Sequence, residues 1–292
     1  MMRLLYAFLP LIILIILATV ACWLGYYLLL AFGDVVEFRK IISKTTLVLL
    51  LLSIFPLKAW LKLSWQDLGF APPRQFLHQM GLGLLIGIIT LLPVLLVLYG
   101  LDVHIIDTSR DWTVLKACKR IGISLLLALL ISFLEEPLFR GILLASLRQK
   151  LSLSLAVGLS AFYYASLHFL KAKSSVPYAE ISPAKGFDLM LEAFANWFNP
   201  AIFSALLALW VVGVFLALIR IEFRHSLGIC VGCHAGWVWL IKTSKDFLDV
   251  NPKSDYLFLV SGYDGVVGPL VTIWLSLAIA GYWLWKQRCT NP

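Results

Sequence analysis

The segment KRIGISLLLALLISFLEEPLFRGILLASLR, residues 119–148, combines two features that rarely occur together. It is an apolar run of spanning length, since a transmembrane helix needs about 20 mostly apolar residues. Near its middle, however, it carries two adjacent carboxylates, a proline and an arginine: Glu135, Glu136, Pro137 and Arg140. An ionisable group in the bilayer core costs several kcal/mol and is normally paired and functional. The segment therefore predicts a transmembrane helix that carries a functional site.

The rest of the chain has the composition of a polytopic membrane protein. Of its 292 residues, 61% are hydrophobic and 14% are charged, whereas an ordinary globular domain has about 25% charged residues. We expect an all-α fold, a polytopic transmembrane helical bundle of about eight spans, which forms a single membrane domain over residues 1–292. The candidate spans are residues 4–32, 45–63, 80–99, 119–148, 151–170, 200–220, 226–243 and 266–286.

The formal net charge of +8 fits this interpretation. Lys and Arg lie in short clusters between the apolar runs, where they anchor helix ends. They form no basic stripe interleaved with aromatic residues, so the sequence predicts the lipid bilayer as a partner and no nucleic acid. Residues 171–199 contain an amphipathic stretch, which we expect to lie along the membrane surface or to dip into it beside the site.

Helical geometry separates the two carboxylates of residues 119–148. Glu136 and Arg140 are four residues apart on one helix face and can form an ion pair. Glu135 is rotated by about 100° from Glu136 and can face a different cavity. Pro137 has no N–H, so the carbonyl of Phe133 loses its partner and the helix can kink and admit water. The motif predicts one restrained carboxylate and one available carboxylate beside a wet defect.

Two further polar motifs interrupt apolar helices. The first is YASLH, residues 164–168, which ends in His168, and the second is CVGCHAGWV, residues 230–238, which contains His234. A carboxylate and two imidazoles around a water molecule suit hydrolysis, with Glu135 as general base and a histidine at the oxyanion. Helix tilts can bring the three side chains to one depth in the membrane.

Together these motifs resemble the CPBP (CAAX protease and bacteriocin-processing, or Abi) family of intramembrane proteases, which is related to the Ras-converting enzyme. The family pattern is Glu-Glu-x-x-x-Arg, Phe-x-x-x-His and His-x-x-x-Asn on separate transmembrane helices. The resemblance covers residues 119–243, a catalytic core of this type. The matching positions are Glu135, Glu136 and Arg140 with Phe139, then Tyr164 (in place of Phe) and His168, then His234 with Val238 (in place of Asn).

The resemblance implies a glutamic intramembrane endopeptidase that hydrolyses a peptide bond of a membrane-associated or lipid-anchored protein or peptide. On this analogy Glu135 activates water with help from His168, and His234 lies at the oxyanion site. Glu136, Arg140, Tyr164 and the position of Val238 support this constellation. The missing Asn at position 238 removes one oxyanion donor, a loss that can cost about 10²–10³-fold in rate. We expect a multi-pass protein of the bacterial inner (cell) membrane.

Several alternatives stay open at this point. The same three side chains could serve a proton-coupled transporter, although the sequence shows no inverted repeat, or a non-catalytic membrane scaffold of the same fold. We expect no cofactor and no metal; zinc held by Glu135, His168 and His234 is a minority interpretation. Residues 230–234 also read C-x-x-C-H, the pattern of c-type haem attachment. Because this motif lies in an apolar helix beside Gly228 and Gly232, we expect Cys230 and Cys233 to pack as small apolar residues.

Overall fold

The computed structural model of the chain describes residues 2–33 and 36–290; residues 1, 34–35 and 291–292 of the predicted membrane domain lie outside this part. The structure is 76% helical, which confirms the all-α fold. The helices are α1 (Met2–Phe32), α2 (Phe38–Trp60), α3 (Pro73–Gly100), α4 (Val114–Glu136), η1 (Pro137–Leu143), α5 (Leu144–Arg148), α6 (Leu153–Leu167), η2 (Tyr178–Glu180), α7 (Pro183–Ala195), η3 (Asn196–Phe198), η4 (Pro200–Ile202), α8 (Phe203–Glu222), α9 (Leu227–Phe247), η5 (Leu257–Leu259) and α10 (Pro269–Thr290). Two short strands, β1 (His104–Ile106) and β2 (Leu248–Val250), pair antiparallel.

Five helical segments of the described residues are long and apolar enough to cross a membrane. Each of the predicted spans coincides with a helix, but α6 has only 15 residues, so the count of about eight spans stays a prediction. The outward faces carry large apolar side chains such as Phe8, Leu96 and Leu126, which are more than half exposed. Such a surface suits lipid rather than water.

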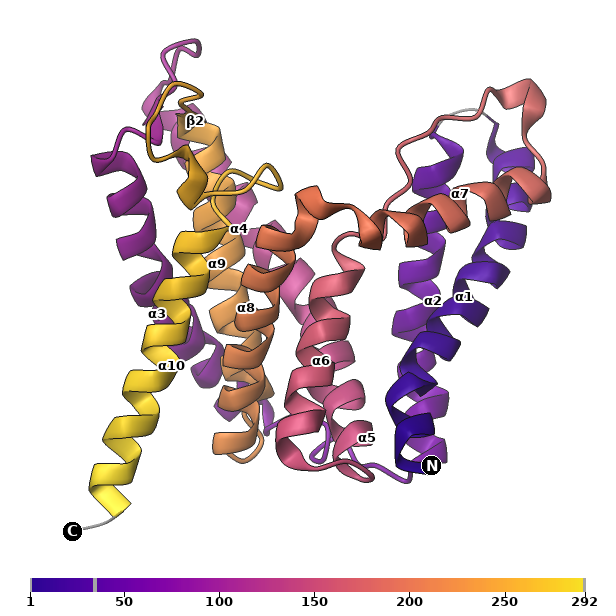
Figure 1. Cartoon of the computed structure of the whole chain (residues 1–292), viewed down its shortest axis with the longest axis horizontal. Helices are drawn as coiled ribbons and strands as arrows, with labels where there is room; N and C mark the ends of the chain where they lie inside the picture. Colours follow the sequence, from indigo (N-terminus) through magenta and orange to yellow (C-terminus); the bar gives the residue numbers. More distant parts are fainter. Residues whose placement is uncertain (1, 34–35, 291–292) are drawn as a thin grey trace.

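The helices form two groups (Figure 1). α1 and α2 stand as a pair at one side of the molecule, α3, α4, α8, α9 and α10 gather at the other, and α6 lies between them. α1 begins and α10 ends at the same end of the molecule. α6 therefore separates a small helical pair from a larger bundle.

The predicted amphipathic stretch contains α7, which crosses one end of α1 and α2 (Figure 1). Leu189 of α7 is buried in a small apolar core with Ala21, Cys22 and Phe38. Ser182 caps the first turn of α7 by accepting a hydrogen bond from the N–H of Lys185. α7 thus packs on α1 and α2 through its apolar face, and its place at a membrane surface remains a prediction.

The contact between α3 and α9 is built from glycines. Gly83 and Gly87 of α3 and Gly228, Gly232 and Gly236 of α9 each lie so close to the opposite helix that a Cβ atom has no room: on Gly228 it would lie 2.7 Å from the carbonyl oxygen of Phe76, and on Gly236 2.9 Å from that of Leu84. Small residues at four-residue spacing let transmembrane helices approach to backbone contact. This interface places α9, and with it His234, against the bundle.

Candidate active site

The polar motif of the fourth predicted span lies at a break in the α-helix. α4 ends at Glu136, and residues 137–143 form the π-helix η1 before α5 continues the segment. Pro137 cannot donate a backbone hydrogen bond, and π-turns occur mostly as interruptions of α-helices at functional sites. The predicted irregularity at Pro137 is therefore present, as a π-helix rather than as an open kink. Pro137 to Ile142 are buried, so the irregular backbone lies inside protein.

Glu136 is the restrained carboxylate that the sequence predicts. Its side chain is fully buried, and its Oε1 atom lies 3.2 Å from Nη1 of Arg140 in an ion pair. The same Oε1 atom lies 2.8 Å from Nδ1 of His234 on α9. Nη2 of Arg140 reaches the carbonyl oxygen of Gly213 on α8 at 3.5 Å. One buried carboxylate thus connects η1 to α9, and its arginine extends the connection to α8.

Glu135 has different surroundings. Its side chain keeps 23% of its exposure, against none for Glu136. Its Oε2 atom lies 4.0 Å from Nε2 of His234 and has no hydrogen-bond partner. Because Arg140 is paired with Glu136, the carboxylate of Glu135 is left without an arginine partner and lines a cavity.

His168 and Tyr164 complete the cluster from α6. His168 follows the last residue of α6, and its Nδ1 atom lies 2.8 Å from the carbonyl oxygen of Tyr164. Because a carbonyl oxygen only accepts, Nδ1 is the donor of this hydrogen bond, and Nε2 is the ring nitrogen that is left for another partner. The ring of Tyr164 is packed between the site's other groups, 4.7 Å from the ring of His168 and 5.9 Å from that of His234. Its face lies 4.2 Å from the guanidinium carbon of Arg140, a cation–π contact.

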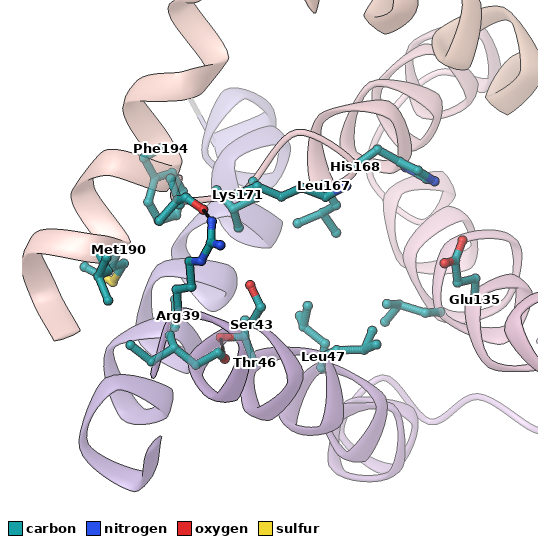
Figure 2. A pocket seen from close by; sticks show the side chains of 18 of the residues that line it. Arg39, Ser43, Thr46, Leu47, Glu135, Leu167, His168, Lys171, Met190 and Phe194 are labelled. Atoms are coloured by element: carbon teal, nitrogen blue, oxygen red, sulfur yellow. Dashed lines mark hydrogen bonds between the residues drawn. The ribbon is translucent and has the colours of Figure 1, made fainter. Parts of the chain in front are cut away.

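Two cavities meet at His168. A cavity of about 250 Å³ opens toward α2 and α7 and is lined by Glu135 and His168; Figure 2 shows these two side chains at one end and Arg39, Thr46 and Met190 at the other. A larger cavity of about 590 Å³ lies on the opposite side and is lined by Tyr164, His168, His234 and Val238. The structure therefore brings all of the predicted site residues to one junction, with access from two sides.

The haem interpretation does not fit this arrangement. Cys230 and Cys233 are both fully buried within α9, and Sγ of Cys230 lies 3.4 Å from the carbonyl oxygen of Leu216 on α8. Thioether attachment needs both thiols to be accessible, so these cysteines are packing residues.

A zinc site is not arranged either. Among the residues that the structure describes, no group of three or more His, Cys, Asp or Glu side chains is placed to hold a metal ion.

Some residues beside the site carry no signal in the sequence. Tyr263, in the segment before α10, has its ring 6.4 Å from that of His168, and Nζ of Lys171 lies 5.4 Å from the Tyr263 ring. Trp237 donates from Nε1 to Oγ1 of Thr90 at 2.8 Å, which joins α9 to α3 within the larger cavity. Lys171 is three residues beyond His168, and that proximity is the one hint that sequence reasoning could have used.

Residues 118–240 match a family model described as Type II CAAX prenyl endopeptidase Rce1-like. The matched segment contains all three motifs and confirms the predicted resemblance. It does not favour the transporter or the scaffold as alternatives. No curated protein and no solved structure matches the chain. The chain is thus an integral membrane protein whose residues 118–240 are similar to the Rce1-like type II CAAX prenyl endopeptidases.

Proposed function

We propose that the chain is a glutamic intramembrane endopeptidase and that Glu135 is its general base. The observation that carries this proposal is the unequal treatment of the two carboxylates. Glu136 is buried and held through its Oε1 atom by Arg140 and His234, whereas Glu135 keeps part of its exposure and lines a cavity together with His168. A water molecule between Glu135 and His168 would have an acceptor ready for its proton.

In the proposed reaction Glu135 takes a proton from this water as the water oxygen attacks the carbonyl carbon of the scissile peptide bond. His168 helps to orient the water through its Nε2 atom. The tetrahedral intermediate then collapses, the C–N bond breaks, and the proton passes to the leaving amine. A positioned general base of this kind contributes about 10²–10⁴-fold to the rate.

The proposed role of His234 is to stabilise the oxyanion. Its Nδ1 atom donates to the carboxylate of Glu136, which directs Nε2 toward Glu135 and the junction of the cavities. A ring that carries a proton on both nitrogens can donate from Nε2–H to an oxyanion. Glu136 and Arg140 are then positioning residues, which act through His234.

The proposed substrate is a membrane-associated protein that carries a lipid, of the prenylated type named in the family description. The cavity that contains Glu135 shares Leu50, Leu138, Phe139 and Leu167 with an adjacent cavity of about 360 Å³ between α1, α2 and η1. These shared residues are apolar, which suits contact with a lipid chain of the substrate beside Glu135.

The test is cleavage of a reporter peptide by the purified full chain in lipid nanodiscs. The peptide ends in an S-prenylated Cys followed by two aliphatic residues and a terminal residue, the pattern of prenylated C-termini. Glu135→Gln should lower kcat by about 10³-fold while the fold persists, whereas Glu180→Gln, remote from the site, should cleave normally. Wild-type rates in Glu135→Gln would refute the assigned role.

A further inference from the structure

The larger cavity carries an excess of positive charge that the proposed reaction does not use. It extends from Tyr164, His168 and His234 toward the end of α9, where Lys242 and Lys245 line it. Lys171, which follows α6, lines both cavities and lies beside His168 in Figure 2. The cations therefore surround the outer part of a space whose inner part is the candidate active site.

The carboxylates of this cavity are already engaged. Asp246 pairs with Nε of Arg120 at 3.2 Å and lies 3.4 Å from Oγ of Ser124. Asp264 accepts hydrogen bonds from the backbone N–H groups of Val266 and Val267 at 3.0 and 2.7 Å. Within the described part of the chain, no ion pair joins Lys171, Lys242 or Lys245 to a carboxylate. None of these three ammonium groups is neutralised by a carboxylate, and Nζ of Lys171 lies over the ring of Tyr263.

The positions of the lysines on α9 set their distance from the site. His234, Val238, Lys242 and Lys245 share one face of α9, at spacings of three or four residues. At 1.5 Å per residue, Lys242 and Lys245 lie about 12 and 16 Å beyond His234 along the helix axis. An extended peptide covers such a span with about three to five residues. Helical side chains lean toward the N-terminus, which brings both ammonium groups back toward His234.

We propose that Lys171, Lys242 and Lys245 form a subsite for a carboxylate of the peptide substrate, about three to five residues from the scissile bond. This proposal deepens the proposed function and rests on it. A terminal carboxylate and an Asp or Glu side chain offer the same chemistry. The smaller cavity is less suited to this task, because its Arg39 is paired with Glu37 and donates to the carbonyl oxygens of Ala172 and Lys173.

The experiment measures binding separately from cleavage. The fluorescent reporter peptide described above is titrated onto Glu135→Gln in nanodiscs of neutral lipid, in three forms: free acid, C-terminal amide, and amide with Glu as the terminal residue. We expect Lys242→Gln/Lys245→Gln to raise Kd for the free acid about tenfold, the effect of losing a charge-assisted contact. The amide peptide should bind the protein with intact lysines with a Kd about tenfold higher than that of the free acid. Lys242→Gln/Lys245→Gln should leave the Kd of the amide unchanged. If the amide peptide with a terminal Glu binds as tightly as the free acid, the subsite accepts a side-chain carboxylate as well as a terminal one.

Lys116→Gln/Lys119→Gln is the matched control, since it removes the same charge from exposed residues of α4 that line neither cavity. Equal effects of the two double variants, or equal binding of acid and amide, would overturn the subsite. So would a lysine effect that emerges only with anionic lipid, which would assign the lysines to phospholipid headgroups. Lys171→Gln should raise KM more than it lowers kcat.

The outcomes also separate this proposal from the one on which it rests. If cleavage depends on Glu135 but the Kd of the peptide does not change in Lys242→Gln/Lys245→Gln, the subsite proposal is wrong and the proposed endopeptidase function is retained. If the peptide binds in a lysine- and carboxylate-dependent manner but is not cleaved by the wild-type chain, the function is wrong and the anion subsite stands.

Discussion

Glu135 and Glu136 are neighbours in the chain, yet the fold gives them opposite surroundings. Glu136 is fully buried against Arg140 and His234, whereas Glu135 borders a cavity and has only the 4.0 Å contact between its Oε2 atom and Nε2 of His234. Adjacent helical residues point about 100° apart, so two consecutive carboxylates can serve a structural and a chemical purpose at once. The proposed function uses this division, with Glu135 as the base and Glu136 as the residue that positions His234.

Substitution of the two glutamates should therefore have different consequences. Glu136→Gln leaves the buried guanidinium of Arg140 without its counter-charge, and breaking a buried pair in this way costs about 3–5 kcal/mol. Glu135→Gln removes no direct hydrogen bond and should leave the unfolding temperature almost unchanged. Thermal unfolding in detergent, read by tryptophan fluorescence, measures both. Equal melting temperatures for the two variants would contradict the assignment of Glu136 as the restrained residue.

Substitution of Val238 should raise the rate of cleavage rather than lower it. It is half-buried, lines the larger cavity one turn beyond His234, and replaces the Asn of the family pattern. Val238→Asn adds a donor near the proposed oxyanion, and one such donor is worth about 10²–10³-fold in rate. We expect kcat to rise while KM changes little. Val238→Ile, which adds no donor, is the control, and a kcat in Val238→Asn no higher than in this control would place the oxyanion elsewhere.

At the scale of elements, η1 and α9 determine where the chemistry can occur. The π-helix interrupts the segment directly after Glu136, and Oγ of Ser160 on α6 donates to the carbonyl oxygen of Phe139 within it. α9 contributes His234 from a helix that is held at backbone contact with α3 through glycines. The site is thus assembled between elements, and its geometry depends on how closely α3 and α9 approach.

A larger residue in this interface should displace His234. Gly232 faces the carbonyl group of Met80 so closely that Gly232→Val must separate the helices. Overpacking lowers the free energy of unfolding by about 1–3 kcal/mol even where side chains can adjust. A backbone carbonyl group moves less easily than a side chain, so the loss here should be at least as large. We expect lower thermal stability together with lost cleavage. Gly81→Val on α3 is the control, because a Cβ there meets no atom within 4 Å; similar losses in both variants would contradict the argument from close packing.

At the scale of the whole molecule, the segment from Lys171 to α7 links the α1–α2 pair to the larger bundle. Oε1 of Glu192 accepts hydrogen bonds from the backbone N–H groups of Lys173 and Ser174 at 2.7 and 3.1 Å. The N–H of Lys173 is the main reason that the pKa of Glu192 lies below its usual 4.5. A carboxyl whose pKa is lowered by folding stabilises the structure above that range and ceases to do so once it is protonated.

The attachment of this segment should therefore be present at neutral pH and lost as the pH falls below 4.5. A dye on residue 175, in a background without the exposed Cys118 and Cys289, reports it through fluorescence anisotropy. Anisotropy should drop on acidification in the wild-type background and be low at every pH in Glu192→Ala. Glu180→Ala should keep the transition. An unchanged pH profile in Glu192→Ala would show that another group holds the segment.

Much of this architecture follows from local properties of the chain. Apolar runs such as 80–99 and 200–220 predict α3 and α8, because a backbone in lipid must satisfy its own hydrogen bonds and a helix does so within one segment. The pairing of Glu136 with Arg140 and the interruption at Pro137 also follow from helical spacing and from the missing N–H of proline. The family match over residues 118–240 rests on the same motifs.

Other features depend on elements that are distant in the chain. The hydrogen bond between Glu136 and His234 joins residues 98 positions apart, and the approach of Tyr263 to His168 depends on the path of a segment without helical periodicity. The separation into two cavities, and the unpaired lysines along one of them, arise from how α2, α7 and α10 pack around η1 and α6. Residue spacing describes one helix face at a time, whereas a cavity is what several faces leave between them, so its shape and charge appear only once the helices have packed.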